Sequence, residues 1–202
     1  MTMLYMIKEG SNLKAKHIPI ILLVILLVSG CFISRQNNNP SVVKLGSHFS
    51  VDNTSESRVL LSNVDALAAS GLYYAAWGTG GKTPYENSDG ETIDLYDAQI
   101  YLLFGEYNDS GTAAENMQSW LDAGRTNYEV IREDEIQFCG QVCMRLTYRF
   151  PDTDSPYTNG ISIFGVLDNN AVCIELTCRD TFAGDPQAAM DEFLDCCTYA
   201  AD

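Results

Sequence analysis

Six cysteines in the last third of the sequence have the side chains with the widest range of chemistry in this protein. In an exported domain an even number of cysteines permits disulfide bonds, and sequence alone cannot choose among the fifteen complete pairings. Buried free thiols are the alternative. A metal site is disfavoured, because no C-x2-C pair occurs and the nearest histidine, His48, is remote in the sequence. The candidate disulfide cysteines are Cys139, Cys143, Cys173, Cys178, Cys196 and Cys197.

The adjacent residues Cys196 and Cys197 also raise the hypothesis of a thiol- or disulfide-active protein. Neighbouring residues on a helix point about 100° apart, so two such thiols do not face each other. Cys197 also falls on the apolar stripe of a predicted helix. We therefore favour core packing for this thiol.

A glycine-rich segment at residues 76–83 matches a relaxed phosphate-loop pattern, with alanine in place of the first glycine. Such a loop requires a helix that begins at its last two residues, Lys82 and Thr83. Pro84 follows directly, no apolar periodicity comes after it, and the acidic residues nearby would repel a triphosphate. We expect no nucleotide site here.

Two acidic segments invite a calcium hypothesis. Asp152 and Asp154 stand in a loop, but Pro156 and Tyr157 occupy the positions where an EF-hand needs an oxygen ligand and a glycine. We predict a solvated loop there. The acidic residues of segment 86–97 leave a weak calcium site open as an alternative.

Catalytic residues are not evident. Nucleophilic hydrolysis needs a base beside serine or cysteine, yet His48 is the only histidine after residue 30, and no G-x-S-x-G motif occurs. A carboxylate pair that hydrolyses envelope glycans stays open, because such pairs meet only in the fold. We name no catalytic residue, no metal ligand and no cofactor, and we leave open whether the protein is an enzyme.

Three aromatic residues, Tyr73, Tyr74 and Trp77, cluster before the glycine-rich segment. Aromatic side chains beside a loop can form a binding patch for a protein or a sugar. Alternation along a strand places such residues in the core just as well. Of these two interpretations we favour the core.

The N-terminus has the organisation of an export signal. Lys8, Lys14 and Lys16 precede an apolar run at residues 18–28, and the small residues Ser29 and Gly30 follow it. The run has 11 residues, whereas a membrane-spanning helix needs about 20. Its length therefore disfavours an anchor helix that is never cut.

The sequence Val28-Ser29-Gly30-Cys31 resembles the processing site of bacterial lipoprotein signals. The resemblance implies a thioether-linked diacylglycerol on Cys31, which becomes the new N-terminus, with fatty acids such as palmitate. It places the protein on the cell membrane, lipid-anchored and facing outside the cytoplasm. An uncut anchor and an ordinary cleaved signal are the alternatives.

The charge balance disfavours partners that are polyanions. Removal of residues 1–30 takes away three of the 12 basic and one of the 27 acidic residues, which leaves 9 and 26. A surface this acidic repels nucleic acid and anionic lipid headgroups. The lipid on Cys31, rather than electrostatic attraction, is then what holds the protein to the membrane. Solubility alone also accounts for the charge.

The predicted organisation has three parts. Residues 1–30 are the lipoprotein signal peptide, and residues 31–46 are the lipidated cysteine and a polar, proline-broken tether. Residues 47–202 are long enough for one domain with a sizeable core, and no internal repeat divides them.

Alternating and helical periodicities give the order of elements. Short strands are expected near residues 49–51, 58–61 and 70–77, followed by a long loop at 78–94. A strand at 96–104 precedes a helix from the capping box Thr112–Glu115 to Gly124. Four strands at 128–138, 142–150, 161–167 and 171–178 form an antiparallel meander, and Asp185 caps the last helix. This order predicts an α+β fold, an antiparallel sheet with helices packed on its faces.

Residues 135–148, Glu-Ile-Gln-Phe-Cys-Gly-Gln-Val-Cys-Met-Arg-Leu-Thr-Tyr, resemble the central hairpin of PsbP-like domains. The strand pair that follows and the last helix, with Phe193, continue the resemblance over residues 95–200. It implies an α/β/α sandwich around an antiparallel sheet, in a family whose members mostly bind or scaffold other proteins. Cysteines on both sides of the glycine turn are not part of the family pattern, and no site residue is carried over.

The sequence therefore favours a membrane-anchored cell-surface lipoprotein that binds or scaffolds an envelope protein without catalysing a reaction. A glycan hydrolase with an acidic pair and a thiol-active envelope protein are the alternatives. Neither nucleic acid nor nucleotide is an expected partner.

Overall fold

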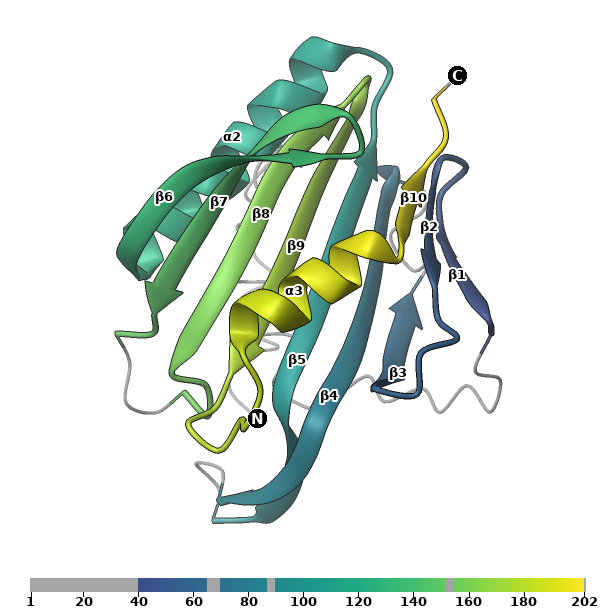
Figure 1. Cartoon of the computed structure of the whole chain (residues 1–202). Helices are drawn as coiled ribbons and strands as arrows, with labels where there is room; N and C mark the ends of the chain where they lie inside the picture. Colours follow the sequence, from purple (N-terminus) through teal and green to yellow (C-terminus); the bar gives the residue numbers. More distant parts are fainter. Residues whose placement is uncertain (1–39, 65–69, 87–89, 152–154, 202) are drawn as a thin grey trace, which may run out of the picture.

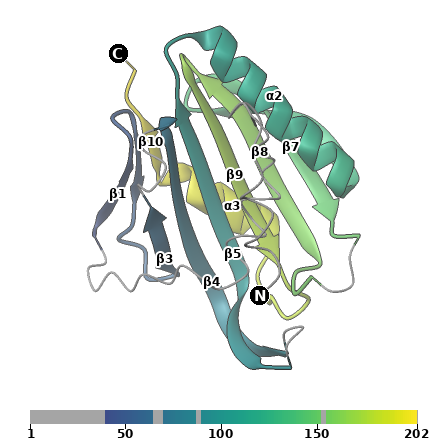
Figure 2. The same ribbon diagram turned by 180° about the vertical axis from the view of Figure 1, so that it is seen from behind.

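The computed structural model describes residues 40–64, 70–86, 90–151 and 155–201, and its centre is a seven-stranded antiparallel sheet with a helix on each face (Figures 1 and 2). The strand order in this sheet is β3-β4-β5-β9-β8-β7-β6, and every neighbouring pair is antiparallel. Its strands are β3 (Arg58–Val64), β4 (Leu72–Glu86), β5 (Thr92–Glu106), β6 (Glu129–Phe138), β7 (Gln141–Arg149), β8 (Asn159–Leu167) and β9 (Asn170–Cys178).

Two helices lie on opposite faces of this sheet. Helix α2 (Ser110–Asn127) packs on β8 and β9 from one side, and α3 (Pro186–Asp195) crosses the same strands on the other side (Figures 1 and 2). A smaller antiparallel sheet completes the second layer, with the order β1-β2-β10. Its strands are β1 (Val42–Leu45), β2 (Phe49–Asp52) and β10 (Cys197–Tyr199). The predicted α+β class and the four-strand meander are confirmed.

The main core lies between the long sheet and the layer of α3 and the small sheet. Alternation along β5 sends Ile100, Leu102 and Phe104 to this side, and all three are buried, because successive side chains of a strand point to opposite faces. The ring of Phe49 in the small sheet lies 5.2 Å from that of Phe104. On the other face, Leu103 packs in a second core beneath α2.

The folded domain begins earlier than the sequence predicted. Strand β1 lies inside residues 31–46, the segment expected to be a tether, and its side chains Val43 and Leu45 are fully buried. The prediction took the polar run before Ser41 as typical of the whole segment. Burial of alternate apolar residues in a strand outweighs that local composition.

The expected loop at residues 78–94 is also wrong. Strand β4 continues to Glu86 and pairs with β5 from Thr92 onwards, with a bulge between Thr79 and Lys82. The bulge accommodates the glycine-rich residues without ending the pairing of β4 with β5. Arg179, which follows β9, donates hydrogen bonds to the backbone oxygens of Thr83 and Pro84 and so fixes the extension.

Both ends of α2 differ from the prediction. Asp109, rather than Thr112, is the N-cap, and its Oδ1 accepts a 2.8 Å hydrogen bond from the Thr112 backbone N–H. The helix also continues past Gly124, which lies against Leu146 and Phe164, where a Cβ would come within 3.2 Å of Leu146 Cδ1. This glycine therefore allows close packing and does not end the helix.

Candidate functional site

A groove of about 260 Å³ lies beside the first turns of α3, where the helix faces β3 and β4. The N-cap Asp185 fixes the start of the helix by accepting a 2.9 Å hydrogen bond from the Gln187 N–H, and Pro186 occupies the first helical position. We call this feature the α3 groove. Its lining residues are Ser57, Arg58, Thr79, Ile100, Phe182, Gly184, Asp185, Ala188, Ala189 and Glu192.

Arg58 supplies the wall of the α3 groove nearest β3, and its side chain is only 3% exposed. Nη2 donates a 3.0 Å hydrogen bond to Sγ of Cys196, and Nη1 lies 3.5 Å from Oε1 of Glu192. The guanidinium also lies over the ring of Phe193, 5.4 Å from its centroid. Nε–H is buried without an acceptor, so this charge is incompletely satisfied, which is costly in a protein interior.

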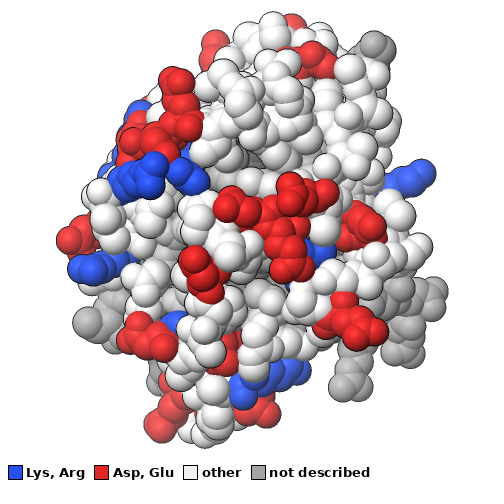
Figure 3. Space-filling model, in the orientation of Figure 1, with Lys and Arg blue, Asp and Glu red and all other residues white. Residues whose placement is uncertain are grey.

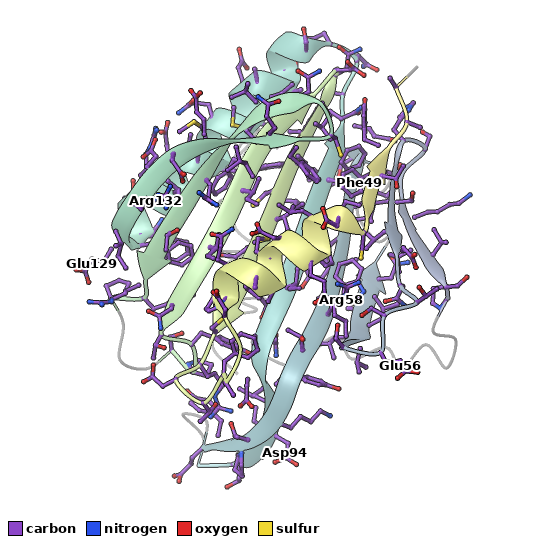
Figure 4. All side chains as sticks on the ribbon, in the orientation of Figure 1. Phe49, Glu56, Arg58, Asp94, Glu129 and Arg132 are labelled. Atoms are coloured by element: carbon purple, nitrogen blue, oxygen red, sulfur yellow. The ribbon has the colours of Figure 1, made fainter. Side chains whose placement is uncertain are left out.

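The rim of the groove is acidic. Glu192 is 56% exposed at its side chain, and its Oε1 accepts a 3.0 Å hydrogen bond from the Ser57 hydroxyl. Asp185 is exposed at the other end of the groove. Figure 3 shows a group of acidic side chains over α3, and Figure 4 shows Arg58 beside the helix. The α3 groove therefore combines an apolar floor with a rim that carries negative charge.

A second polar group lies on the opposite face, beneath α2. Oε1 of the buried Glu175 accepts hydrogen bonds from the hydroxyls of Tyr128 at 2.9 Å, Ser162 at 3.4 Å and Tyr148. Burial raises the pKa of Glu175, although these hydroxyls act in the other direction by stabilising the carboxylate. The adjoining cavity is about 10 Å³, which is room for about one water molecule. This network is enclosed and offers no space for a substrate.

The structure separates the six cysteines between the two faces. Cys173 lies under α2, and the other five lie on the side of α3. All six are free thiols here, so disulfide pairing among them stays a prediction. Cys197 begins β10 and does not lie on the α3 stripe, which corrects the sequence assignment.

Burial is the main influence on most of these thiols. It raises the pKa of Cys143 to about 11 and that of Cys178 to about 12, and it also raises the pKa of Cys139, Cys173 and Cys197. The thiolate is the nucleophilic form of cysteine, so thiols with raised pKa values are poor nucleophiles at neutral pH. This environment gives no support to the thiol-active hypothesis.

The carboxylate pair closest to a cleft is Asp185 and Glu192. They lie seven residues apart along α3, which corresponds to about 10 Å along the helix axis. Carboxylates of glycoside hydrolases lie about 5–9.5 Å apart, and the general acid sits in apolar surroundings. Asp185 and Glu192 are both exposed. This geometry does not favour the hydrolase hypothesis.

The remaining candidates of the sequence analysis lie in several places. The phosphate-loop-like segment lies within β4, Trp77 is fully buried, and His48 Nδ1 is 3.1 Å from the backbone oxygen of Ala200. Asp97, from the acidic segment, is buried and accepts hydrogen bonds from Thr83 and Thr181. Cys31, Asp152 and Asp154 lie outside the described residues.

Sequence reasoning missed the two most unusual polar residues. The sequence does contain an indication for Glu175, because it is a single acidic residue within the apolar strand β9. It contains no such indication for Arg58, because a basic residue before an apolar run is usually exposed.

Within the described ranges, no three His, Cys, Asp or Glu side chains are arranged to hold a metal ion. Neither α2 nor α3, the helices of the part of the chain that the structure describes, has the length and apolar character needed to cross a membrane.

No protein-family model matches the sequence, and no curated protein matches it. Among solved structures, cyanobacterial PsbP (CyanoP) from Synechocystis sp. PCC 6803, determined in solution, is similar with a TM-score of 0.38. The alignment has 12% identity and covers 72% of this chain and 94% of that one.

Proposed function

We propose that this protein is a lipid-anchored binding module of the cell surface that contacts a partner protein through the α3 groove and catalyses no reaction. The observation that carries the proposal is the groove itself, with its apolar floor, buried Arg58 and charged rim. Sites for small molecules usually measure 300–1,000 Å³. At about 260 Å³ the α3 groove is better suited to one or two anchoring side chains of a partner.

The membrane attachment rests on the N-terminal sequence. A diacylglycerol on Cys31 and a further fatty acid would hold the protein durably, since each buried CH2 contributes about 0.8 kcal/mol. The protein would then face outside the cytoplasm. Without residues 1–30 it carries 9 basic and 26 acidic residues, which gives nucleic acid and nucleotide little affinity for its surface, so an envelope protein is the expected partner.

We also propose a PsbP-like relationship for the domain. Its support is the hairpin sequence at residues 135–148, together with the order of four meander strands and a terminal helix. The helices on opposite faces of the sheet agree with the sandwich that this resemblance implies.

Attachment is tested by the intact mass of protein recovered from its native host and by fractionation of a Cys31→Ser variant. We expect an N-terminus at Cys31 that bears acyl chains, and a variant that is neither lipidated nor held by membranes. An unprocessed leader or a chain without fatty acid would refute the anchor.

Binding is tested with a photoreactive amino acid at Ala188, on the rim of the α3 groove, in the full chain in native cells. The matched control carries the same amino acid at Glu129, which is exposed on β6, the edge strand opposite to β3 and Arg58 (Figure 4). We expect a discrete protein adduct from position 188 that is absent from position 129. No adduct, or identical adducts at both positions, contradicts the proposal.

A further inference from the structure

The charge around the α3 groove indicates the chemistry of its partner. Within Pro186–Asp195 the charged residues are Asp191, Glu192 and Asp195, and no basic residue occurs. The N-cap Asp185 adds a fourth carboxylate at the start of the helix. The whole chain carries 27 acidic and 12 basic residues, so no surplus of positive charge elsewhere offsets this field. A partner that approaches α3 therefore meets negative potential.

Arg58 does not reverse this sign. Its guanidinium is almost completely buried, and Glu192 lies 3.5 Å away. The exposed end of this ion pair is the carboxylate, which is the group that a partner meets. The rim thus attracts cations even though one wall of the groove contains an arginine.

The unpartnered Nε–H of Arg58 is a second observation, independent of the acidic rim. A buried donor without an acceptor costs free energy, and Arg58 lines the groove, so a small shift of its side chain toward an oxygen atom of an occupant would satisfy this donor. Peptide carbonyl groups are strong acceptors that every residue carries. The floor of the groove adds an apolar requirement, since it is formed by Ile100, Phe182 and Ala189.

We propose that the α3 groove binds a basic segment of a partner protein. An apolar side chain of that segment occupies the floor, a flanking lysine or arginine lies against Asp185 or Glu192, and a backbone carbonyl approaches Arg58. This inference rests on the proposed function and adds the chemistry of the partner. Complementary charge at the rim gives selectivity and faster association more than it gives affinity.

The test uses short fluorescent peptides and the full-length protein in detergent micelles, with fluorescence anisotropy as the readout. The probes are peptides of alternating lysine and leucine, glutamate and leucine, and lysine and serine. We expect the lysine–leucine peptide to bind more tightly than both others, and its affinity to fall as salt rises. Tighter binding of the glutamate–leucine peptide would overturn the inference.

Substitutions then locate the binding. Replacing Asp185 by Asn preserves the helix cap, because both residues cap well, and Glu192→Gln preserves an acceptor for Ser57. Neutralising both carboxylates is expected to reduce the affinity for the lysine–leucine peptide about fivefold, which corresponds to the loss of two exposed ion pairs. Glu129→Gln, which is remote from the groove, is the matched control and should have no effect.

A third variant distinguishes failure of this inference from failure of the proposed function. Ala188→Phe places a large side chain on the exposed rim and should reduce peptide binding and the adduct formed by the native partner. Peptide binding that is lost in this variant but unchanged when the carboxylates are neutralised would overturn the basic-segment inference alone. Binding that none of the groove variants alters would remove both proposals.

Discussion

The Nη2 atom of Arg58 donates a 3.0 Å hydrogen bond to the Sγ of Cys196, which joins the first residue of β3 to the C-cap of α3. The side chain of Arg58 is almost completely buried, so an acceptor beside its guanidinium stabilises the folded state. This contact also holds one wall of the α3 groove in place.

Removal of this acceptor should destabilise the domain. We expect Cys196→Ala to lower the free energy of unfolding by about 1 kcal/mol, because a buried guanidinium N–H loses its partner. Cys196→Ser keeps an acceptor and should cost clearly less. Urea denaturation of the three proteins measures the difference, and equal midpoints for Ala and Ser would show that the hydrogen bond contributes nothing.

Arg58 itself should matter more for binding than for stability. Replacing a buried ion pair by apolar residues is often neutral or stabilising, and removal of one partner is costly only when it leaves the other charge buried. Glu192 is 56% exposed and stays hydrated, so Arg58→Met should unfold at no lower urea concentration than the wild type. Arg58→Ala, which leaves a cavity, should be less stable by about 2 kcal/mol or more. We expect Arg58→Met to bind the lysine–leucine peptide more weakly. A stable variant that binds normally would show that Arg58 has no part in recognition.

Glu175 should make the stability of the domain fall as pH rises. Its pKa is raised in the folded state by burial, so below its ordinary value of 4.5 the neutral form is present in both folded and unfolded chains. Above that value the unfolded chain releases the proton first, and the stabilisation is lost as pH rises through the folded pKa. Glu175→Gln should remove this contribution.

The measurement is urea denaturation of both proteins between about pH 4 and pH 8. Glu133→Gln is an informative control, because the hydrogen bond from Arg125 lowers the pKa of Glu133, so its stabilisation is lost as pH falls. A wild-type curve parallel to that of Glu175→Gln would contradict the assignment.

Asn53 connects the start of the domain to its core. Its Oδ1 accepts a 2.9 Å hydrogen bond from the buried indole N–H of Trp77, and its Nδ2 donates to the Pro40 backbone oxygen at 2.9 Å. Asn53→Ala should cost about 1–3 kcal/mol, since it leaves the indole N–H unsatisfied. In a Trp77→Phe background the same change should cost less, and thermal unfolding of the four proteins gives the coupling. Additive effects would show that the two side chains are not coupled.

Local sequence patterns were sufficient wherever an element is determined by its own residues. The alternation at residues 96–104 and in the four meander segments located these strands, and Asp185-Pro186 located the start of α3. Side-chain periodicity and helix capping depend on a few neighbouring residues, so they can be recognised without knowledge of the fold. The wrong predictions concern elements that depend on residues distant in the sequence. Strand β1 required partners in β2, and the extension of β4 required Arg179 from beyond β9.

The sequence was enough to predict the class of the fold, the order of most elements and a lipoprotein-like signal with Cys31 as its proposed acceptor. Which polar groups are buried, and which of them meet, follows only from the folded arrangement. Arg58 and Cys196 stand 138 positions apart, and β3 brings the arginine against the end of α3. No periodicity encodes such a contact, because burial and charge pairing depend on surfaces from distant segments that come together only when the chain folds.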